Sequence, residues 1–298
     1  MITVTLDKHH LTRYAPTPSG FLHLGNVFSF LNTYHLAKAS EAKILLRIDD
    51  YDQERVKKKY IQDIFDTLDF LEIPFDSGPK TLKEFESKYS SKHRKVNYTK
   101  ALEILKSKNM LFACDCSRKK VERMHPKGFY TGYCQKRNLD FNLPEINWRT
   151  KLPFHHPVQI KTTDGWESGK TPGILNDIIV KKKDGLPSYQ LASVVDDLTF
   201  GIDLIVRGKD LWGSSLAQIH IARHLGINDF GQSTFHHHQL IKNTQNRKLS
   251  KSAGDTSIQF LRKSGKKKSD VFRLLADQLG IKQPIESIED FSNYCSQK

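Results

Sequence analysis

A segment near the start of the chain carries residue types suited to binding a nucleotide phosphate. It runs from Pro18 to Asn26 with the sequence PSGFLHLGN, and we expect it between a strand and a helix. A helix N-terminus offers free N–H groups and the positive end of the helix dipole, which suit phosphate. Gly20 and Gly25 would let the backbone approach a nucleotide closely, and His23 would donate a hydrogen bond as charge develops there. Taken alone, the segment also fits a plain loop with one exposed histidine.

A second basic segment, Arg247–Ser252 with the sequence RKLSKS, lies far downstream. Lys248 and Lys251 flank Ser250 in a neighbourhood rich in small polar residues. A mobile loop of this kind would close over a triphosphate and stabilise the leaving pyrophosphate. An isolated K-x-S-K sequence fits a solvated basic loop better, so the segment gains weight only in combination with the first.

Cys114, Cys116 and Cys134 form a third candidate site. The chain has four cysteines, and a cluster of three in a reducing compartment indicates a metal site more than a disulfide framework. Thiolates suit Zn²⁺, whose closed four-ligand sites stabilise folds and do not activate water. Three cysteines leave one tetrahedral position open, for Tyr130, His125 or water. The competing interpretation is a set of unligated thiols.

Neighbouring histidines occur at His9-His10, His155-His156 and His236–His238. Adjacent residues of a strand point to opposite faces, so they rarely hold one metal ion together. We therefore do not assign these histidines to a metal site.

The elements that must position these residues alternate between strand and helix. Residues 11–15 predict a short strand, and apolar residues at helical spacing predict a helix that opens at Asn26. Residues 44–48 predict a buried parallel strand, and residues 56–71 predict a second amphipathic helix. This alternation is typical of a doubly wound α/β fold with a parallel sheet.

The pattern loosens after Pro74, and we expect residues 76–176 to form an insertion that contains the cysteines. Strands are expected again at 177–180 and 204–206. We expect a helix at 211–225 that is closed by Gly226. A further helix is expected at 269–279, capped by Ser269 and closed by Gly280. The predicted domains are 1–75 and 177–235 for the two halves of the sheet domain, 76–176 for the insertion, and 236–298 for the basic loop and a short helical region.

Composition narrows the class of protein. The 298 residues are 38% hydrophobic and 27% charged, as in an ordinary globular protein. Neither a membrane-spanning run nor a secretory signal is evident, so we expect a cytoplasmic protein. The net charge of +14 favours a polyanionic partner, although basic residues also coat ordinary solvated surfaces.

Together the segments resemble the class I aminoacyl-tRNA synthetases. His23–Asn26 is similar to the HIGH signature and Lys248–Ser252 to the KMSKS signature of that family. The chain looks most like the glutamyl branch, since Arg13–Gly20 (RYAPTPSG) resembles its R-F-A-P-S-P-[ST]-G opening. Further blocks that resemble this branch are Leu46–Asp52, Val195–Asp197 and Val206–Leu211.

The resemblance implies a Rossmann-like catalytic core that binds glutamate. Arginine forks suit the substrate carboxylates, and an acid suits its ammonium group. Asp49 takes the latter role, although the family usually has glutamate there, which leaves the choice of amino acid open. The glutamate-binding residues implied are Arg13, Ala15, Ser19, Asp49, Tyr189 and Arg207.

The resemblance also implies the residues that act on ATP, which binds with Mg²⁺. The implied catalytic residues are His23, Asn26, Lys248 and Lys251, and the implied ATP-binding residues are Gly20, His23, Gly25 and Lys251. In the family's zinc site, C-x-C…Y-x₃-C, the tyrosine is the fourth ligand. This favours Tyr130 beside Cys114, Cys116 and Cys134.

The short stretch after Ser252 leads us to expect no anticodon-binding domain. Relatives of this size are the glutamyl-queuosine tRNA(Asp) synthetases. The resemblance thus implies a monomer that activates L-glutamate to glutamyl-adenylate and transfers it to the queuosine base of tRNA(Asp). The alternatives are a small glutamyl-tRNA synthetase that charges a tRNA 3′ end, an enzyme that loads glutamate onto a non-RNA acceptor, and a catalytically dead tRNA-binding paralogue.

Overall fold

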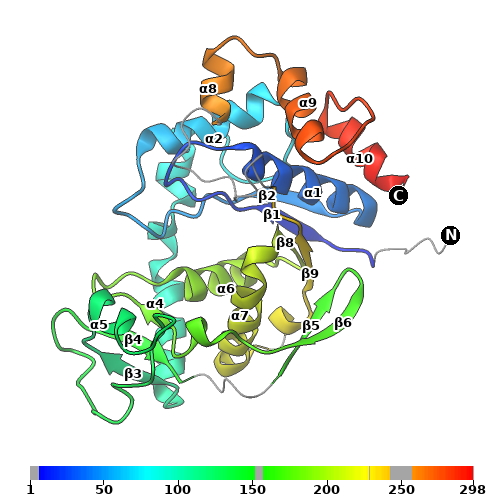
Figure 1. The fold of residues 1–298 in the computed structure, drawn as a ribbon. Coiled ribbons are helices and arrows are strands. Elements are labelled where there is room, and N and C mark those ends of the chain that lie inside the picture. The colour runs from blue at the N-terminus through cyan, green and yellow to red at the C-terminus, as the bar shows by residue number, and fades with distance from the viewer. Residues whose placement is uncertain (1–6, 152–156, 228, 242–256, 298) are drawn as a thin grey trace. The chain divides into compact units, whose positions relative to one another are not determined.

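A computed structural model describes residues 7–151, 157–227, 229–241 and 257–297, and the chain divides into two compact units (Figure 1). Unit 1 comprises residues 1–93, 204–209 and 236–298, and unit 2 comprises residues 94–203 and 210–235. The predicted loop from Lys248 to Ser252 lies outside the described residues. The four-part division of the chain expected above stays a prediction.

Unit 1 contains the predicted strands near the start of the chain. β1 (Leu11–Tyr14) and β2 (Lys43–Leu46) pair in parallel, with Thr12 opposite Ile44. β2 ends two residues before the predicted strand does. β8 (Leu204–Gly208) lies beside β1, where the Thr12 hydroxyl donates to the Leu204 carbonyl at 2.8 Å. The start of the chain is therefore parallel α/β structure, as expected.

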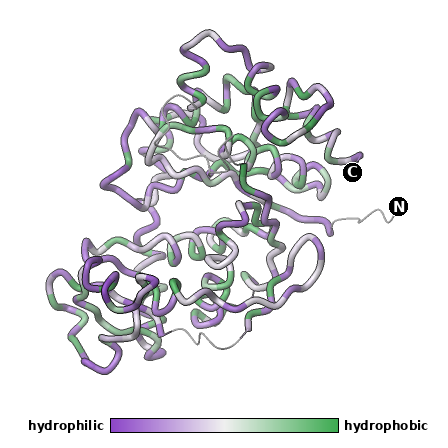
Figure 2. Tube along the Cα trace, in the orientation of Figure 1, coloured by the Kyte–Doolittle hydropathy of each residue, from purple (hydrophilic) through white to green (hydrophobic). Residues whose placement is uncertain are grey.

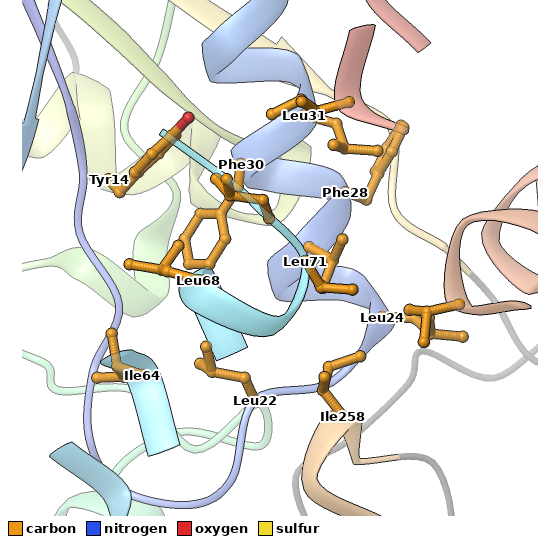
Figure 3. Close-up of a cluster of buried hydrophobic side chains, with 14 of the residues drawn as sticks. Tyr14, Leu22, Leu24, Phe28, Phe30, Leu31, Ile64, Leu68, Leu71 and Ile258 are labelled. Carbon is orange, nitrogen blue, oxygen red and sulfur yellow. The ribbon is translucent and has the colours of Figure 1, made fainter. Parts of the chain in front are cut away.

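α1 (Leu24–Ser40) connects β1 to β2, and α2 (Lys58–Phe70) follows β2. α1 begins two residues before the predicted start, because His23 rather than a later residue caps it. Figure 3 shows Leu24 and Leu31 of α1 in one cluster with Leu68 of α2. This apolar contact fixes the helix that carries the first motif.

Unit 1 also contains the short α3 (Leu82–Glu84) and, after residue 256, the helices α8 (Ile258–Lys263), α9 (Lys268–Gln278) and α10 (Ile288–Ser296). The predicted cap of α9 at Ser269 is wrong, since Lys267 is the N-cap and its backbone N–H donates to the Asp270 carboxylate at 2.9 Å. Gly280, at a φ of 67°, follows the helix end as expected. Phe291 of α10 packs edge-on against Phe28 of α1, so this helical region shares the core of unit 1.

Unit 2 is built from helices and mixed sheets. β5 and β6 form an antiparallel hairpin, and β3, β4 and β7 form an antiparallel sheet. Strands β3 to β6 lie in the stretch expected to be an insertion, where no strand was predicted. Strand β7, expected in the parallel sheet domain, instead pairs antiparallel with β4. The strands are β3 (Leu111–Cys114), β4 (Asn147–Thr150), β5 (Val158–Thr162), β6 (Gly165–Gly169) and β7 (Ile179–Lys181). The longer helices are α4 (Lys95–Ser107), α6 (Tyr189–Phe200) and α7 (Trp212–Leu225).

A buried ion pair ties the first helix of unit 2 to a helix far along the chain. The Arg94 guanidinium, just before α4, donates from Nε and from NH2 to the Asp196 carboxylate of α6, each at 2.8 Å. Tyr98 Oη donates to the same carboxylate at 2.8 Å. Asp196 is fully buried, so its charge depends on these partners.

β9 (Thr234–His238) begins in unit 2 and ends in unit 1. In unit 2, Phe235 pairs in parallel with Thr162 of β5. In unit 1, the His238 ring packs edge-on against Phe28 at 5.0 Å. Among residues 7–151, 157–227, 229–241 and 257–297, no helix has the length and apolar character needed to cross a membrane.

Candidate active site and metal centre

His23 organises the start of α1. Its Nδ1 accepts a hydrogen bond from the Gly25 N–H at 3.1 Å, and the Asn26 side-chain oxygen accepts from the His23 N–H at 3.0 Å. This reciprocal capping box leaves the helix N-terminus well ordered, with its dipole directed at the loop before it. Two predicted catalytic residues, His23 and Asn26, are therefore together at one helix end.

Gly25 is required by the position of the His23 ring. A Cβ at this position would lie 2.9 Å from His23 Cε1 and 3.0 Å from its Nδ1. Such contacts are too short, so a larger residue would push the imidazole off the helix end. Glycine is therefore needed at this position because a side chain would clash with the histidine ring. The backbone conformation itself does not require glycine.

The strand-like residues around His23 are anchored to the segment that follows the predicted basic loop. The Ile258 N–H donates to the Leu22 carbonyl at 2.8 Å, and His23 forms an antiparallel bridge with Ser257. Ser257 is also the N-cap of α8 and stands five residues after Ser252 in the sequence. The first signature is thus hydrogen-bonded to the segment at Ser257 and Ile258, within unit 1.

Asp63 of α2 contacts residues on both sides of this junction. Its carboxylate accepts from the Leu22 N–H at 3.0 Å and lies 3.5 Å from the Arg262 guanidinium of α8. Burial raises the pKa of Asp63, although both partners act in the opposite direction. Asp63 links three segments of unit 1, and periodicity alone identified it only as a residue of a helix.

Arg13 and Arg207, the predicted carboxylate-binding residues, lie on the adjacent strands β1 and β8. Both are buried, each with 4% of its surface exposed. Arg13 NH1 donates to the Val206 carbonyl at 3.2 Å. Both arginine side chains thus lie in the interior of unit 1, and guanidinium groups of this kind suit the carboxylates of a dicarboxylic substrate.

Asp49 lies beside the loop between β1 and α1, and its carboxylate is already paired with Arg47. Its carboxylate accepts from Arg47 Nε at 2.7 Å and from Arg47 NH2 at 3.1 Å, and Tyr51 Oη donates to it at 3.2 Å. Its backbone N–H donates to the Pro16 carbonyl at 3.0 Å, which holds it beside the segment that contains Ala15 and Ser19. The structure thus adds Arg47, a charged partner that motif matching did not assign a role.

The remaining predicted residues of the active site are distributed as follows. Gly20 is buried in the loop before α1. Tyr189 opens α6 in unit 2, and its place in a glutamate pocket stays a prediction. Lys248 and Lys251 lie outside the described residues.

The three predicted cysteine ligands meet in unit 2. The sulfur atoms of Cys114, Cys116 and Cys134 all lie within 4.8 Å of one another, and each cysteine is buried. Cys116 Sγ and Cys134 Sγ are 3.5 Å apart. Sulfur atoms that bind one tetrahedral Zn²⁺ at 2.3 Å are about 3.8 Å apart, so the spacing fits this metal.

Tyr130 belongs to the same cluster, whereas His125 does not. Tyr130 Oη accepts from the Cys134 N–H at 2.7 Å, and the residue is 97% buried, with 3% of its surface exposed. The His125 ring instead stacks on Phe129 at 3.6 Å, and its Nδ1 accepts from the Lys127 N–H. A phenol oxygen and three sulfurs therefore form a donor set suited to a structural Zn²⁺.

The electrostatics of the cluster are asymmetric. Burial, followed by the contact with Cys134, raises the pKa of Cys116. Burial acts in the same direction on Cys134, but hydrogen bonds from Tyr130 and Arg137 outweigh it and lower the pKa of that thiol. Arg137 NH1 lies 3.4 Å from Cys134 Sγ and also pairs with Asp115. Hydrogen bonds from Tyr130 and Arg137 thus favour the thiolate form of Cys134, the form that binds a metal.

Comparison with known proteins gives a consistent family. The model of the catalytic domain of class I tRNA synthetases (E and Q) matches residues 10–293. The chain is 31% identical, over 94% of its length, to the glutamyl-Q tRNA(Asp) synthetase of Nocardia farcinica, of which it covers 88%. It is 32% identical, over 95% of its length, to the glutamate–tRNA ligase of Clostridium novyi, of which it covers 60%.

The fold is similar to that of solved glutamate–tRNA synthetases. The structure from Elizabethkingia anophelis aligns with a TM-score of 0.73 at 22% identity, and the alignment covers 96% of this chain and 65% of that one. The mixed sheets of unit 2 and the parallel strands of unit 1 are thus parts of the class I synthetase catalytic fold. On the evidence of its sequence and fold, the chain belongs to the class I tRNA synthetases (E and Q), as a catalytic domain of that ligase family.

Proposed function

We propose that the chain activates L-glutamate with ATP and transfers the glutamyl group to the queuosine base of tRNA(Asp). The observation that carries the first half is the arrangement in unit 1. Two buried arginines on adjacent strands lie in the same unit as a helix start capped by the histidine of the first signature. The second half, transfer to the queuosine base of tRNA(Asp), rests on the names of several relatives, which are glutamyl-Q tRNA(Asp) synthetases.

The glutamate end of the site is cationic. Arg13 and Arg207 would bind the substrate carboxylates, because a guanidinium group forms paired hydrogen bonds with a carboxylate. Asp49 would accept a hydrogen bond from the ammonium group. Since Arg47 already neutralises Asp49, we expect the contact with the ammonium to supply orientation more than net attraction.

In the activation step, a glutamate carboxylate oxygen attacks the α-phosphorus of ATP. The new P–O bond replaces the bond to the β-phosphate bridging oxygen, and pyrophosphate leaves with that electron pair. His23 and the α1 N-terminus would stabilise the charge on the phosphates, with Lys248 and Lys251 acting on the leaving group. Positioning and electrostatics supply the rate, and Mg²⁺ is expected to accompany the nucleotide.

In the transfer step, a hydroxyl of the RNA attacks the carbonyl carbon of glutamyl-adenylate. An ester forms, AMP leaves, and the hydroxyl proton is released to solvent or to the AMP phosphate. Zn²⁺ would be held by Cys114, Cys116, Cys134 and Tyr130, where it would stabilise the fold. The net charge of +14 suits an RNA substrate.

The test is to incubate the protein with ATP, Mg²⁺ and labelled glutamate, together with tRNA(Asp) that contains or lacks queuosine. Label on the modified tRNA alone, within its anticodon fragment after nuclease cleavage, is the expected result. Label at the 3′ end of a tRNA would instead support a glutamate–tRNA ligase. That alternative is favoured by the 32% identity to the Clostridium novyi ligase. Glutamate-dependent ATP–pyrophosphate exchange that never appears, with or without tRNA, would indicate a catalytically dead paralogue.

We further infer that the protein acts in the cytoplasm as a monomer. Light scattering during size-exclusion chromatography tests the second point, with 34.3 kDa expected for one chain.

A further inference from the structure

Asp63 is a buried carboxylate in an amphipathic helix. α2 carries both hydrophilic and hydrophobic residues along its length (Figure 2), and Asp63 lies on its buried side with Ile64 and Phe65. Only 2% of the surface of Asp63 is exposed. A carboxylate is almost never buried to this extent without partners, because water solvates its charge far better than a protein core does. The partners of Asp63 must therefore offset the cost of its burial.

Two partners of Asp63 come from other segments of unit 1. Asp63 Oδ2 accepts from the Leu22 N–H at 3.0 Å, and Oδ1 lies 3.5 Å from NH2 of Arg262 in α8. Among the described residues, Oδ1 accepts no hydrogen bond. The same Arg262 nitrogen donates to Asp66 at 3.1 Å, so the arginine is shared between two carboxylates on one face of α2. Within the described part of the chain, the Leu22 N–H is therefore the hydrogen-bond donor of the Asp63 carboxylate.

Leu22 is held from two sides, directly before His23. Its N–H donates to Asp63 of α2, and its carbonyl accepts from the Ile258 N–H at the start of α8 at 2.8 Å. Its side chain is fully buried in a cluster that also contains Ile258 (Figure 3). The next N–H, that of His23, donates to Asn26 Oδ1 at 3.0 Å. The backbone that carries the His23 ring is thus fixed by three hydrogen bonds, and one of them ends on Asp63.

The tautomer of His23 follows from its own contact. Nδ1 accepts from the Gly25 N–H at 3.1 Å, so the neutral ring carries its proton on Nε2. That Nε2–H is the donor that would stabilise phosphate charge in the activation step. Such a donor is effective only at hydrogen-bond distance from the charge, and a displacement of about 1 Å can cost on the order of 100-fold in rate. A residue that fixes the backbone of this loop therefore acts on the reaction without touching the substrate.

We propose that Asp63 is a positioning residue for the activation step, because it holds the His23 ring in place through the Leu22 N–H. Arg262 supports the carboxylate from α8. The inference rests on the proposed function in that the step is the activation of glutamate by ATP. The competing interpretation is a structural ion pair, in which Asp63 stabilises the fold through Arg262 and has no effect on the position of the His23 ring.

Substitutions at Asp63 separate its hydrogen bond from its charge. Asp63→Asn keeps a side-chain oxygen that can accept from the Leu22 N–H and removes the charge that faces Arg262. Asp63→Ala removes both, and Asp63→Leu, which fills nearly the same space, replaces it if the alanine variant does not fold. The matched control is Asp66→Asn, which neutralises the other carboxylate bound by Arg262 and leaves the Leu22 N–H bonded to Asp63. Chemical denaturation measures the stability of each variant.

The first readout is the environment of the His23 ring, which NMR measures without any need for activity. In protein with isotope-labelled histidines, the signal of the His23 ring Cε1–H is identified by its absence in His23→Asn. We expect this signal to shift in Asp63→Ala, because the Leu22 N–H loses its acceptor and the loop before α1 moves. The signal should stay in place in Asp63→Asn and in Asp66→Asn.

The second readout is the kinetics of glutamate-dependent ATP–pyrophosphate exchange. We expect Asp63→Ala to lower kcat by about 10- to 100-fold and to leave the KM for glutamate unchanged, because the predicted carboxylate-binding arginines lie on β1 and β8. Asp63→Asn should restore most of the rate. In a His23→Ala background, Asp63→Ala should cause no further loss of kcat, although it should lower the stability as much as in the wild type.

A His23 signal that is unchanged in Asp63→Ala, or that shifts equally in Asp63→Asn, would overturn the proposal. Equal losses of kcat on adding Asp63→Ala to the wild type and to His23→Ala would do the same, since they would indicate a structural role. Wild-type protein without exchange refutes the proposed function, and the NMR signal then decides the position of the ring by itself. Exchange together with an unchanged His23 signal refutes the role of Asp63 alone.

Discussion

The start of α1 and the cysteine centre are both assembled from residues close in sequence, yet different forces hold them. The first rests on regular elements: a strand, a capped helix, and the hydrogen bonds that Leu22 donates to Asp63 and accepts from Ile258. The second brings Cys114 at a strand end together with Cys116 and Cys134 on loops, within a small apolar cluster. A site on regular elements is preformed by the core, whereas a site on loops needs ligand bonds to close it.

Metal removal should produce the largest difference between the two regions. Structural Zn²⁺ contributes on the order of 10 kcal/mol in small zinc domains, so chelation should unfold the segment around the centre and leave unit 1 folded. Hydrogen exchange followed by mass spectrometry would locate the loss of protection. Cys116→Ser should reproduce it, with Cys295→Ser as a control, since Cys295 lies outside the cluster. Purified protein without bound metal, or exchange that chelation does not change, would contradict this expectation.

Removing Arg47 should be the most damaging change in unit 1. Asp49 would remain buried without its bidentate partner, and such a change costs about 3–5 kcal/mol. Chemical denaturation of Arg47→Ala measures it. The control is Arg55→Ala, which breaks the exposed pair with Asp52 and should cost less than about 1 kcal/mol. Similar losses for the two variants would show that the Arg47–Asp49 pair is not a structural element of the site.

His23 combines two roles that substitution can separate. His23→Ala removes the cap, for about 1 kcal/mol of stability, and should lower the activation rate by about 10²–10³-fold if the ring stabilises phosphate charge. Asparagine is a good N-cap, so His23→Asn should restore the stability but not the rate. Pyrophosphate exchange and thermal unfolding measure the two effects. If the exchange rate recovers together with the stability in His23→Asn, the histidine acts only as a helix cap.

Gly25→Ala should give the smallest effect on stability and still affect the reaction. The added methyl group would lie 2.9 Å from His23 Cε1, and alanine is otherwise the better helix former by about 1 kcal/mol. We expect the unfolding free energy to change by less than about 1 kcal/mol and the exchange rate to fall by about tenfold. Gly231→Ala, where a Cβ meets nothing within 4 Å, is the control. An unchanged exchange rate would mean that the ring position is not critical.

Much of the fold near the start of the chain was predictable from local patterns. The two strands of the β1–β2 pair and the helices α1 and α2 follow from apolar periodicity, and their predicted ends are off by about two residues at most. The helix start at Leu24 was missed because histidine is an unusual N-cap. The antiparallel sheets of unit 2 were missed because strand pairing depends on partners distant in sequence.

By itself, the sequence determined the identity of the chemistry-bearing residues. The two signatures, the arginines of the predicted glutamate site and the cysteine spacing are readable from residue type and order. Their local geometry also follows in part, since residues a few positions apart on one helix end must meet.

Only the tertiary structure decided which charges neutralise one another and which polar atoms lack partners. Arg94 pairs with Asp196 across 102 positions of the chain. The guanidinium of Arg149 packs against the Tyr130 ring, a contact that no sequence motif predicts. Such contacts arise because packing brings distant segments together, and burial then makes every unpaired polar atom costly. The order of residues in the sequence does not show which polar atoms will become buried, so this free-energy cost could not be predicted from it.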